Sequence, residues 1–430
     1  MRSHDATWGE ALHGTGWAVA GCALRPIQLG IAFPSVLYVA TLALFLFRPP
    51  NLDLPQVDRA AFLLLLFFVA LRTMARRDQV PYVPLISLPM LGLLVLAVLR
   101  AQRETFDAQT WSLIAGKFAV PFVLFHVAAL VFRDAREHKH LAIFTVAALA
   151  YLSFTAIAFM IDAKSLIYPR FILDESLGVH AQRARGPFLQ AVANGLSLNM
   201  LGILVLVLAP KHRRIVLLLW LALPLAILAT MTRAVWISFA LSTVVLAVRL
   251  RDRCLRRASI AAALAGFVAL GAISAGGSSL AGALRDRTEE RGPVEARMAV
   301  YEAGWQMFQE RPWTGWTAGS LYTELARRMP GYHLSQYYIH NTYLSLLLEL
   351  GLPGLLLYGI LLVGLFRLAR AGDGDGVSRL GAVSILRRVW PILLGVYLFN
   401  ACFVDMVYQF VNGLLFTAAG ILCAARESIS

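Results

Sequence analysis

The amino-acid sequence predicts an all-α membrane protein that crosses the bilayer many times, and three observations lead to this fold class. Of its 430 residues, 59% are hydrophobic and only 15% are charged, whereas soluble domains contain roughly 45–50% apolar and about 25% charged residues. The mean hydropathy is +0.67. Apolar runs close to the ~20 residues that a helix needs to span a bilayer recur along the whole chain.

The apolar runs define about 12 transmembrane helices. Each run is rich in Leu, Val, Ala, Ile and Phe. The last two runs are separated by Phe403-Val404-Asp405. In chain order, the runs cover residues 26–47, 60–71, 83–99, 111–132, 141–161, 187–209, 215–230, 234–250, 258–280, 341–366, 389–403 and 406–424.

Positive charges alternate from loop to loop, which predicts the orientation. Arginine and lysine gather in the loops near residues 72–77, 133–139, 211–214, 249–257 and 367–388, whereas the short intervening loops hold only Arg48/Arg59 and Arg100/Arg103. By the positive-inside rule, both termini are cytoplasmic. The net charge of +14 is therefore interpreted as a topology signal, and no nucleic-acid partner is expected.

This orientation places four features on the outer face. They are the loop 162–186, the turn from Thr230 to Arg233, the insertion 281–340 and Asp405. The insertion lies between the ninth and tenth predicted helices of a single integral membrane domain, residues 1–430. A polar segment of about sixty residues cannot lie in hydrocarbon, so we expect it to form a helical periplasmic part and to carry chemistry.

No metal site or cofactor is expected. The four cysteines are scattered and show neither metal-ligand spacing nor a disulfide framework. Asp373-Gly374-Asp375 resembles a metal-binding Asp-X-Asp pair. Its small neighbours and cytoplasmic position instead favour a flexible linker.

His340 is the candidate catalytic residue. It stands where the insertion meets the tenth apolar run, in His340-Asn341-Thr342-Tyr343-Leu344. A helix N-terminus and nearby arginines lower the pKa of a histidine and keep its imidazole neutral. A neutral imidazole accepts protons near pH 7. The alternative is an amphipathic anchor at the membrane interface.

Three arginines at the outer ends of predicted helices are candidate diphosphate ligands: Arg185, Arg233 and Arg297. Arginine binds phosphate oxygens bidentately and stays charged when dehydrated. Arginines also extend to the interface without any function, but the positive-inside rule disfavours them on this face.

Aromatic residues in and beside the insertion are ambiguous, because Trp and Tyr line membrane interfaces and also stack on sugar rings. Polar Asn194 and Asn199, within the sixth run, are expected to form hydrogen bonds between helices rather than to contact substrate. The aromatic residues are Trp305, Trp313, Trp316, Tyr322, Tyr332, Tyr337, Tyr338 and Tyr343.

These segments resemble the O-antigen ligase/polymerase superfamily of bacterial envelope glycosyltransferases. The resemblance covers roughly residues 180–360, and Thr232 stands where many members have serine. Its most specific part joins a Trp-X-Met-Phe run to His-Asn at the next helix. The matching stretches are Arg185-Gly186-Pro187-Phe188, Ala193-Asn194-Gly195, Thr232-Arg233-Ala234-Val235-Trp236, Trp305-Gln306-Met307-Phe308 with Pro312 and Gly315-Trp316, and His340-Asn341-Thr342-Tyr343-Leu344 with Glu349-Leu350-Gly351.

The resemblance implies a GT-C-like enzyme of the bacterial inner membrane whose active site faces the periplasm. Its length and single large insertion favour an O-antigen ligase, which moves O-antigen polysaccharide from undecaprenyl diphosphate to lipid A–core by metal-independent, inverting transfer. O-antigen polymerase and protein O-oligosaccharyltransferase are alternatives. A lipid-linked glycan flippase or transporter is disfavoured, because no inverted repeat is evident and Lys117 is the clearest charge within a helix.

The implied roles can be assigned to individual residues. His340 acts as the base or orients the acceptor hydroxyl, and Arg185 and Arg233, with Arg297, hold the diphosphate. Possible glycan or acceptor contacts are Asn341, Tyr343, Trp316 and Tyr338. The remaining partners are membrane lipids.

Overall fold

The computed structural model describes residues 33–48, 56–103, 105–209, 212–250, 252–275, 282, 292–329, 338–370 and 381–427. Within these residues the protein is helical and contains no β-strand. Several sequence predictions lie outside the described residues, namely the start of the first run, the end of the ninth, Tyr332, Tyr337 and the Asp373–Asp375 linker.

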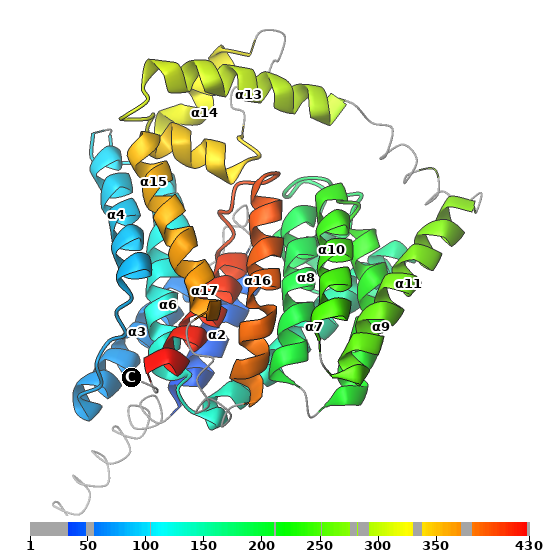
Figure 1. The fold of residues 1–430 in the computed structure, drawn as a ribbon. Helices are drawn as coiled ribbons and strands as arrows, with labels where there is room; N and C mark the ends of the chain where they lie inside the picture. Colours follow the sequence, from blue (N-terminus) through cyan, green and yellow to red (C-terminus); the bar gives the residue numbers. More distant parts are fainter. Residues whose placement is uncertain are drawn as a thin grey trace, which may run out of the picture.

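The described chain forms a bundle of roughly parallel and antiparallel helices with two further helices across one end (Figure 1). The first half contains α2 (Pro34–Leu46), α3 (Val57–Arg76), α4 (Pro84–Ala101), α5 (Ala108–Ile114), the π-helical turn η1 (Ala115–Ala119), α6 (Val120–Val131), α7 (Ala135–Met160) and α8 (Ala191–Leu208). The second half contains α9 (Arg213–Ala229), α10 (Arg233–Arg249), α11 (Arg253–Ala275), α13 (Gly292–Glu310), α14 (Ala318–Arg327), α15 (Thr342–Arg370), α16 (Gly381–Ala401) and α17 (Gln409–Glu427).

Each of the predicted apolar runs coincides with a helix, as far as the described residues extend. The fourth run corresponds to α5, η1 and α6. Together these form one apolar helical segment, Ala108–Val131, that is long enough to cross a membrane. The split between the last two runs is confirmed, because α16 ends at Ala401 and α17 begins at Gln409. The second run was predicted too short, since α3 extends from Val57 to Arg76.

Six helices in the described part of the chain are long and apolar enough to cross a membrane, which supports a multi-pass protein. The α9 and α10 helices have 17 residues each, or about 25 Å at 1.5 Å per residue. The expected total of twelve crossings therefore stays a prediction. The six are Pro84–Ala101, Ala108–Val131, Arg136–Met160, Ala191–Leu208, Thr342–Arg370 and Gly381–Ala401.

Helix α8 lies at the centre of the bundle and is buried on all sides, as expected for a helix that is apolar all round. Its two asparagines form hydrogen bonds within the core. The Asn199 side-chain amide donates to Ser238 Oγ and its carbonyl accepts from Ser242 Oγ, both on α10, so the predicted contact between helices is confirmed. For Asn194 that prediction is wrong, because its amide donates to the Ala184 carbonyl in the preceding loop.

The insertion forms its own small apolar core against α15. Helices α13 and α14 lie across the end of the bundle where α15 begins (Figure 1). Leu348 of α15 packs into this core together with Val300, Met307, Trp316 and Leu321. The insertion is thus attached to the bundle through α15.

Close packing of α17 on α6 depends on Gly420. A Cβ atom there would lie 2.5 Å from the Phe125 carbonyl oxygen and 2.7 Å from Ala128 Cβ. We expect Gly420→Ala to destabilise the fold by about 1–3 kcal/mol, because overpacking displaces the backbone. The measurement is the thermal unfolding midpoint in detergent. Gly395→Ala in α16 is the control, since its added Cβ meets no atom within 4 Å. Equal midpoints for both variants would contradict this packing.

Candidate active site

Backbone and side-chain contacts bring the predicted outer segments to one end of the bundle. The Ala184 amide donates to the Ala229 carbonyl at 3.1 Å and joins the 162–189 loop to the turn before α10. The Gln190 amide group donates to the Tyr408 hydroxyl at 2.9 Å. Segments that are far apart in sequence, and that carry Arg185, Arg233 and Asp405, therefore converge.

The segment 402–408 is in turn attached to the first turn of α15. Thr342 Oγ1 donates to the Val404 carbonyl at 2.8 Å and accepts from the Met406 amide at 3.1 Å. These bonds surround Asp405 and hold it beside the residues that follow His340.

The turn 312–316 exchanges backbone hydrogen bonds with a break in α15. The Trp316 amide donates to the Leu348 carbonyl at 2.6 Å, and the Leu352 amide donates to the Pro312 carbonyl at 2.9 Å. In an unbroken helix Leu352 would donate to Leu348. The insertion thus takes the place of one helical hydrogen bond, and we call this pair of bonds the backbone clasp.

Two glycines make the backbone clasp possible. Gly351 has φ 67° and ψ −167°, a conformation that is essentially restricted to glycine. Gly315 has φ 66°, and a Cβ atom there would lie 2.7 Å from the Leu348 carbonyl oxygen. The close approach of the two backbones therefore explains the glycine in the Pro-X-X-Gly-Trp sequence of the insertion and the glycine in the Leu-Gly sequence of α15.

His340 lies directly before α15. The Asn341 side-chain oxygen caps this helix by accepting from the amides of Tyr343 and Leu344, a standard N-cap arrangement. His340 keeps solvent contact, although protein atoms surround much of its ring. Partial burial and then the positive charge of Arg297 lower the pKa of His340, while the Asp405 carboxylate acts in the opposite direction.

The two other candidate arginines occupy different positions. Arg233 begins α10 and is half-buried. Arg297 lies in α13, also half-buried, and within electrostatic range of His340. The structure therefore places Arg297 within electrostatic range of His340. Arg233 follows the turn that is bonded to the 162–189 loop.

Arg185 differs from the sequence prediction. It is 1% exposed, and its guanidinium donates to the carbonyls of Ile172 at 3.0 Å, Leu177 and Asp174. In this conformation Arg185 fixes the 172–177 loop and does not present its charge to a ligand. Its predicted contact with a diphosphate stays a prediction that requires this loop to move.

The four predicted glycan contacts differ in exposure and in the contacts that they make. Trp316 is only 7% exposed, and the central guanidinium carbons of Arg311 and Arg328 lie 4.0 and 4.9 Å from the centroid of its ring. In this conformation Trp316 packs within the insertion and offers little surface for stacking on a sugar. Asn341 acts as the helix cap. Only Tyr338 is largely exposed, at 55%.

Tyr343 is half-buried and its hydroxyl donates to the Leu398 carbonyl of α16. It therefore links α15 to α16 in this structure. Tyr338 packs against Tyr322 with ring centroids 4.9 Å apart. Of the predicted aromatic contacts, Tyr338 is the one placed to meet a large ligand.

A buried ionic cluster was missed as a unit by sequence reasoning. Lys117 Nζ donates to Glu349 at 2.9 and 3.0 Å, to Asp405 Oδ2 at 3.2 Å and to Ser345 Oγ at 3.0 Å. The side chains of Lys117, Glu349 and Asp405 are only 7%, 9% and 12% exposed. We call these four residues the ionic cluster. The sequence shows that each charged residue of the cluster lies among apolar residues, but it does not show which residues pair with one another.

The local sequence explains why Lys117 points into the bundle. Pro121 lacks an amide hydrogen, so it cannot bond to the Lys117 carbonyl four residues earlier, and its ring crowds that carbonyl. The chain adopts a π-helical turn over Ala115–Ala119 with a Val120-to-Ala115 hydrogen bond. Such turns often occur at functional sites.

In the described part of the chain, no three His, Cys, Asp or Glu side chains are grouped as potential metal ligands.

Comparison with known proteins identifies the chain's relatives. Residues 215–359 match the sequence family described as O-antigen ligase. This match supports membership of the O-antigen ligase/polymerase superfamily. A comparison with curated proteins finds no match. The matched region includes Arg233, Arg297 and His340. Arg185, Lys117 and Asp405 lie outside it.

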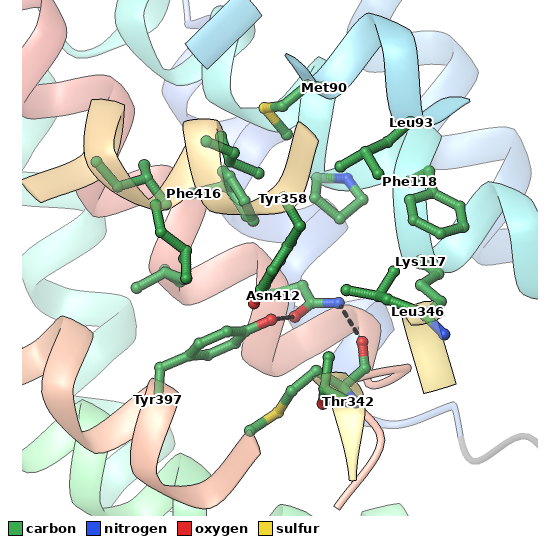
Figure 2. A pocket seen from close by; sticks show the side chains of 16 residues that line it. Met90, Leu93, Lys117, Phe118, Thr342, Leu346, Tyr358, Tyr397, Asn412 and Phe416 are labelled. Atoms are coloured by element: carbon green, nitrogen blue, oxygen red, sulfur yellow. Dashed lines mark hydrogen bonds between the residues drawn. The ribbon is translucent and has the colours of Figure 1, made fainter. Parts of the chain in front are cut away.

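A mostly apolar cavity lies along α15, beginning at its first turn (Figure 2). Its volume is about 40 Å³. At the bottom of the view in Figure 2, the Tyr397 hydroxyl donates to Asn412, and the Asn412 amide donates to the Met406 carbonyl. Lys117 and Thr342 lie at the same side, so the segment 402–408 is supported from below by α16 and α17.

The backbone clasp gives a prediction about the insertion. Gly351→Ala places a Cβ atom 2.6 Å from the Trp313 carbonyl oxygen and strains the backbone, at a cost of about 1–3 kcal/mol. We expect faster cleavage of the 292–329 region in limited proteolysis and a lower unfolding midpoint. Gly359→Ala, also in α15 but with no atom within 4 Å of its added Cβ, should behave as wild type. Equal cleavage rates would exclude the backbone clasp as the main attachment.

Proposed function

We propose that the protein is an O-antigen ligase that transfers O-antigen polysaccharide from undecaprenyl diphosphate to lipid A–core at the periplasmic face of the bacterial inner membrane. The main supporting observation is the placement of His340 beside Arg297, at the end of the bundle where the segments carrying Arg185 and Arg233 also meet. The proposal includes twelve membrane crossings, cytoplasmic termini and a periplasmic insertion.

The proposed reaction needs a proton acceptor and a stabilised leaving group. A hydroxyl of the lipid A–core acceptor attacks the anomeric carbon of the donor sugar, and the bond to the diphosphate breaks with inversion. His340 takes the hydroxyl proton or orients the hydroxyl. The lowered pKa of His340 keeps its imidazole neutral and able to accept a proton near pH 7.

Arg233 and Arg297 stabilise the departing diphosphate in this proposal. Each charged hydrogen bond to a leaving group contributes on the order of 3 kcal/mol, or about a hundredfold in rate. Arg185 holds the 172–177 loop in this structure, so we assign it a supporting role, with direct contact after a loop movement as the alternative. Tyr338 is the proposed aromatic contact to the glycan.

Reconstitution tests the function and the base together. Purified protein is mixed with lipid-linked O-antigen and rough lipopolysaccharide, without nucleotide or ion gradient, and products are separated on a gel. We expect wild type to form high-molecular-weight lipopolysaccharide and His340→Ala to lose on the order of a hundredfold in rate or more. His212→Ala, exposed at the far end of α8, is the control.

Other products would contradict the ligase proposal and indicate a different activity. Longer chains that remain on the lipid carrier indicate a polymerase, and a glycosylated protein acceptor indicates an oligosaccharyltransferase. Movement of the lipid-linked glycan across the bilayer without product indicates a flippase. Wild-type rates with His340→Ala would remove His340 from the chemical step.

The charge of Arg297 gives a prediction about pH dependence. Arg297 lowers the pKa of His340, so Arg297→Gln should raise it. The fraction of neutral imidazole then falls at a higher pH, and the acidic limb of the rate profile moves to higher pH. The measurement is kcat as a function of pH. Arg327→Gln, on the exposed face of α14 and paired with Glu324, should leave the limb in place. An unshifted limb in Arg297→Gln would contradict the electrostatic contact.

A further inference from the structure

The ionic cluster joins three separate parts of the chain. Lys117 comes from η1, Ser345 and Glu349 from α15, and Asp405 from the segment 402–408. Ser345 Oγ also lies 2.9 Å from Asp405 Oδ2 and 3.0 Å from Glu349 Oε1. One ammonium group is therefore shared by two carboxylates that would otherwise repel each other across a single hydroxyl.

Because the cluster is buried, the charge of Lys117 determines whether both carboxylates can stay ionised at this distance. Two carboxylates at such close range do not both stay ionised in a poorly solvated site unless a positive charge lies between them. With Lys117 present, the cluster carries one excess negative charge. Without it, the pair either holds a shared proton or moves apart, and each outcome changes the charge or the geometry of the cluster.

The cluster is directly connected to the candidate base. Thr342, two residues after His340, is hydrogen-bonded on both sides of Asp405 through Val404 and Met406. The Asp405 carboxylate also acts electrostatically on His340, against Arg297. The position of Asp405 therefore affects both the first turn of α15 and the charge that the imidazole experiences.

We propose that Lys117 is a positioning residue for the transfer reaction: by binding Glu349 and Asp405 together, it fixes the 402–408 segment against the first turn of α15 and sets the negative charge that faces His340. This inference rests on the proposed function, and it concerns a residue outside the region that matches the O-antigen ligase family.

Other titratable groups near the cluster do not supply the missing charge. The tyrosines that interact electrostatically with Asp405 or Glu349 are neutral near pH 7, because the pKa of a phenol is ordinarily about 10. Arg297 acts electrostatically on His340. Described groups that interact electrostatically with the two carboxylates from neighbouring elements include His340, Tyr322 of α14, Tyr358 of α15, Tyr397 of α16 and Tyr408 before α17.

The test uses a charge-balanced pair of variants in the reconstituted transfer assay. Lys117→Met removes the ammonium and keeps an apolar stem. We expect kcat to fall on the order of tenfold to a hundredfold, as for a displaced catalytic group, and the rate profile to gain an ionisation from the carboxyl pair. Lys117→Met/Glu349→Gln leaves Asp405 as the only charge and restores the net charge of the cluster. This double variant should recover most of the rate and the wild-type shape of the pH profile.

Controls separate this inference from a general loss of stability. Lys164→Met breaks an exposed pair with Asp162 and should leave rate and profile unchanged. A wild-type rate and profile in Lys117→Met would overturn the inference. The inference would also be overturned if Lys117→Met lowered the rate without changing the pH profile, and also lowered an unfolding midpoint that the added Glu349→Gln substitution did not restore. Wild-type protein that forms no lipopolysaccharide would instead disprove the proposed function.

Discussion

The exchange of backbone hydrogen bonds between the 312–316 turn and α15 is the contact on which the candidate site depends. It replaces the helical bond from Leu352 to Leu348 with two bonds to the insertion, so the insertion is attached without leaving a buried amide or carbonyl unpaired. Glycine at 315 and 351 is needed because the two backbones approach too closely for any Cβ atom. Once this contact is made, α13 lies over the start of α15, and Arg297 comes within electrostatic range of His340.

Buried charges have two different functions in the structure. Arg185 is satisfied by three loop carbonyls and stabilises the conformation of a loop. Lys117 is satisfied by two carboxylates and a hydroxyl from other segments, so it joins elements that would otherwise be independent. Both arrangements follow from the high cost of leaving a charge without partners in an apolar interior. Arg233 and Arg297 are half-buried, and their contact with an anion stays a prediction.

Much of the fold could be predicted from the sequence, because membrane helices must satisfy their backbone hydrogen bonds internally and cover them with apolar side chains. Each of the apolar runs coincides with a helix, as far as the described residues extend. The position of His340 before an apolar run is visible in the sequence, and its catalytic role stays a proposal. The packing of Trp316 could not be predicted, because stacking on a sugar and stacking on Arg311 and Arg328 require the same residue type.

The sequence by itself determined the helical class, the positions of the helices, the polar insertion and the residue types available for glycosyl transfer. These properties depend on local composition, which is readable over windows of about twenty residues. Only the tertiary structure decided which charges are buried among protein groups and which partners they have. It buried Arg185, brought Lys117 to Glu349 and Asp405 across more than 200 positions of sequence, and placed Arg297 near His340. Such pairings depend on how helices pack, and no local pattern in the chain specifies the partner of a buried charge.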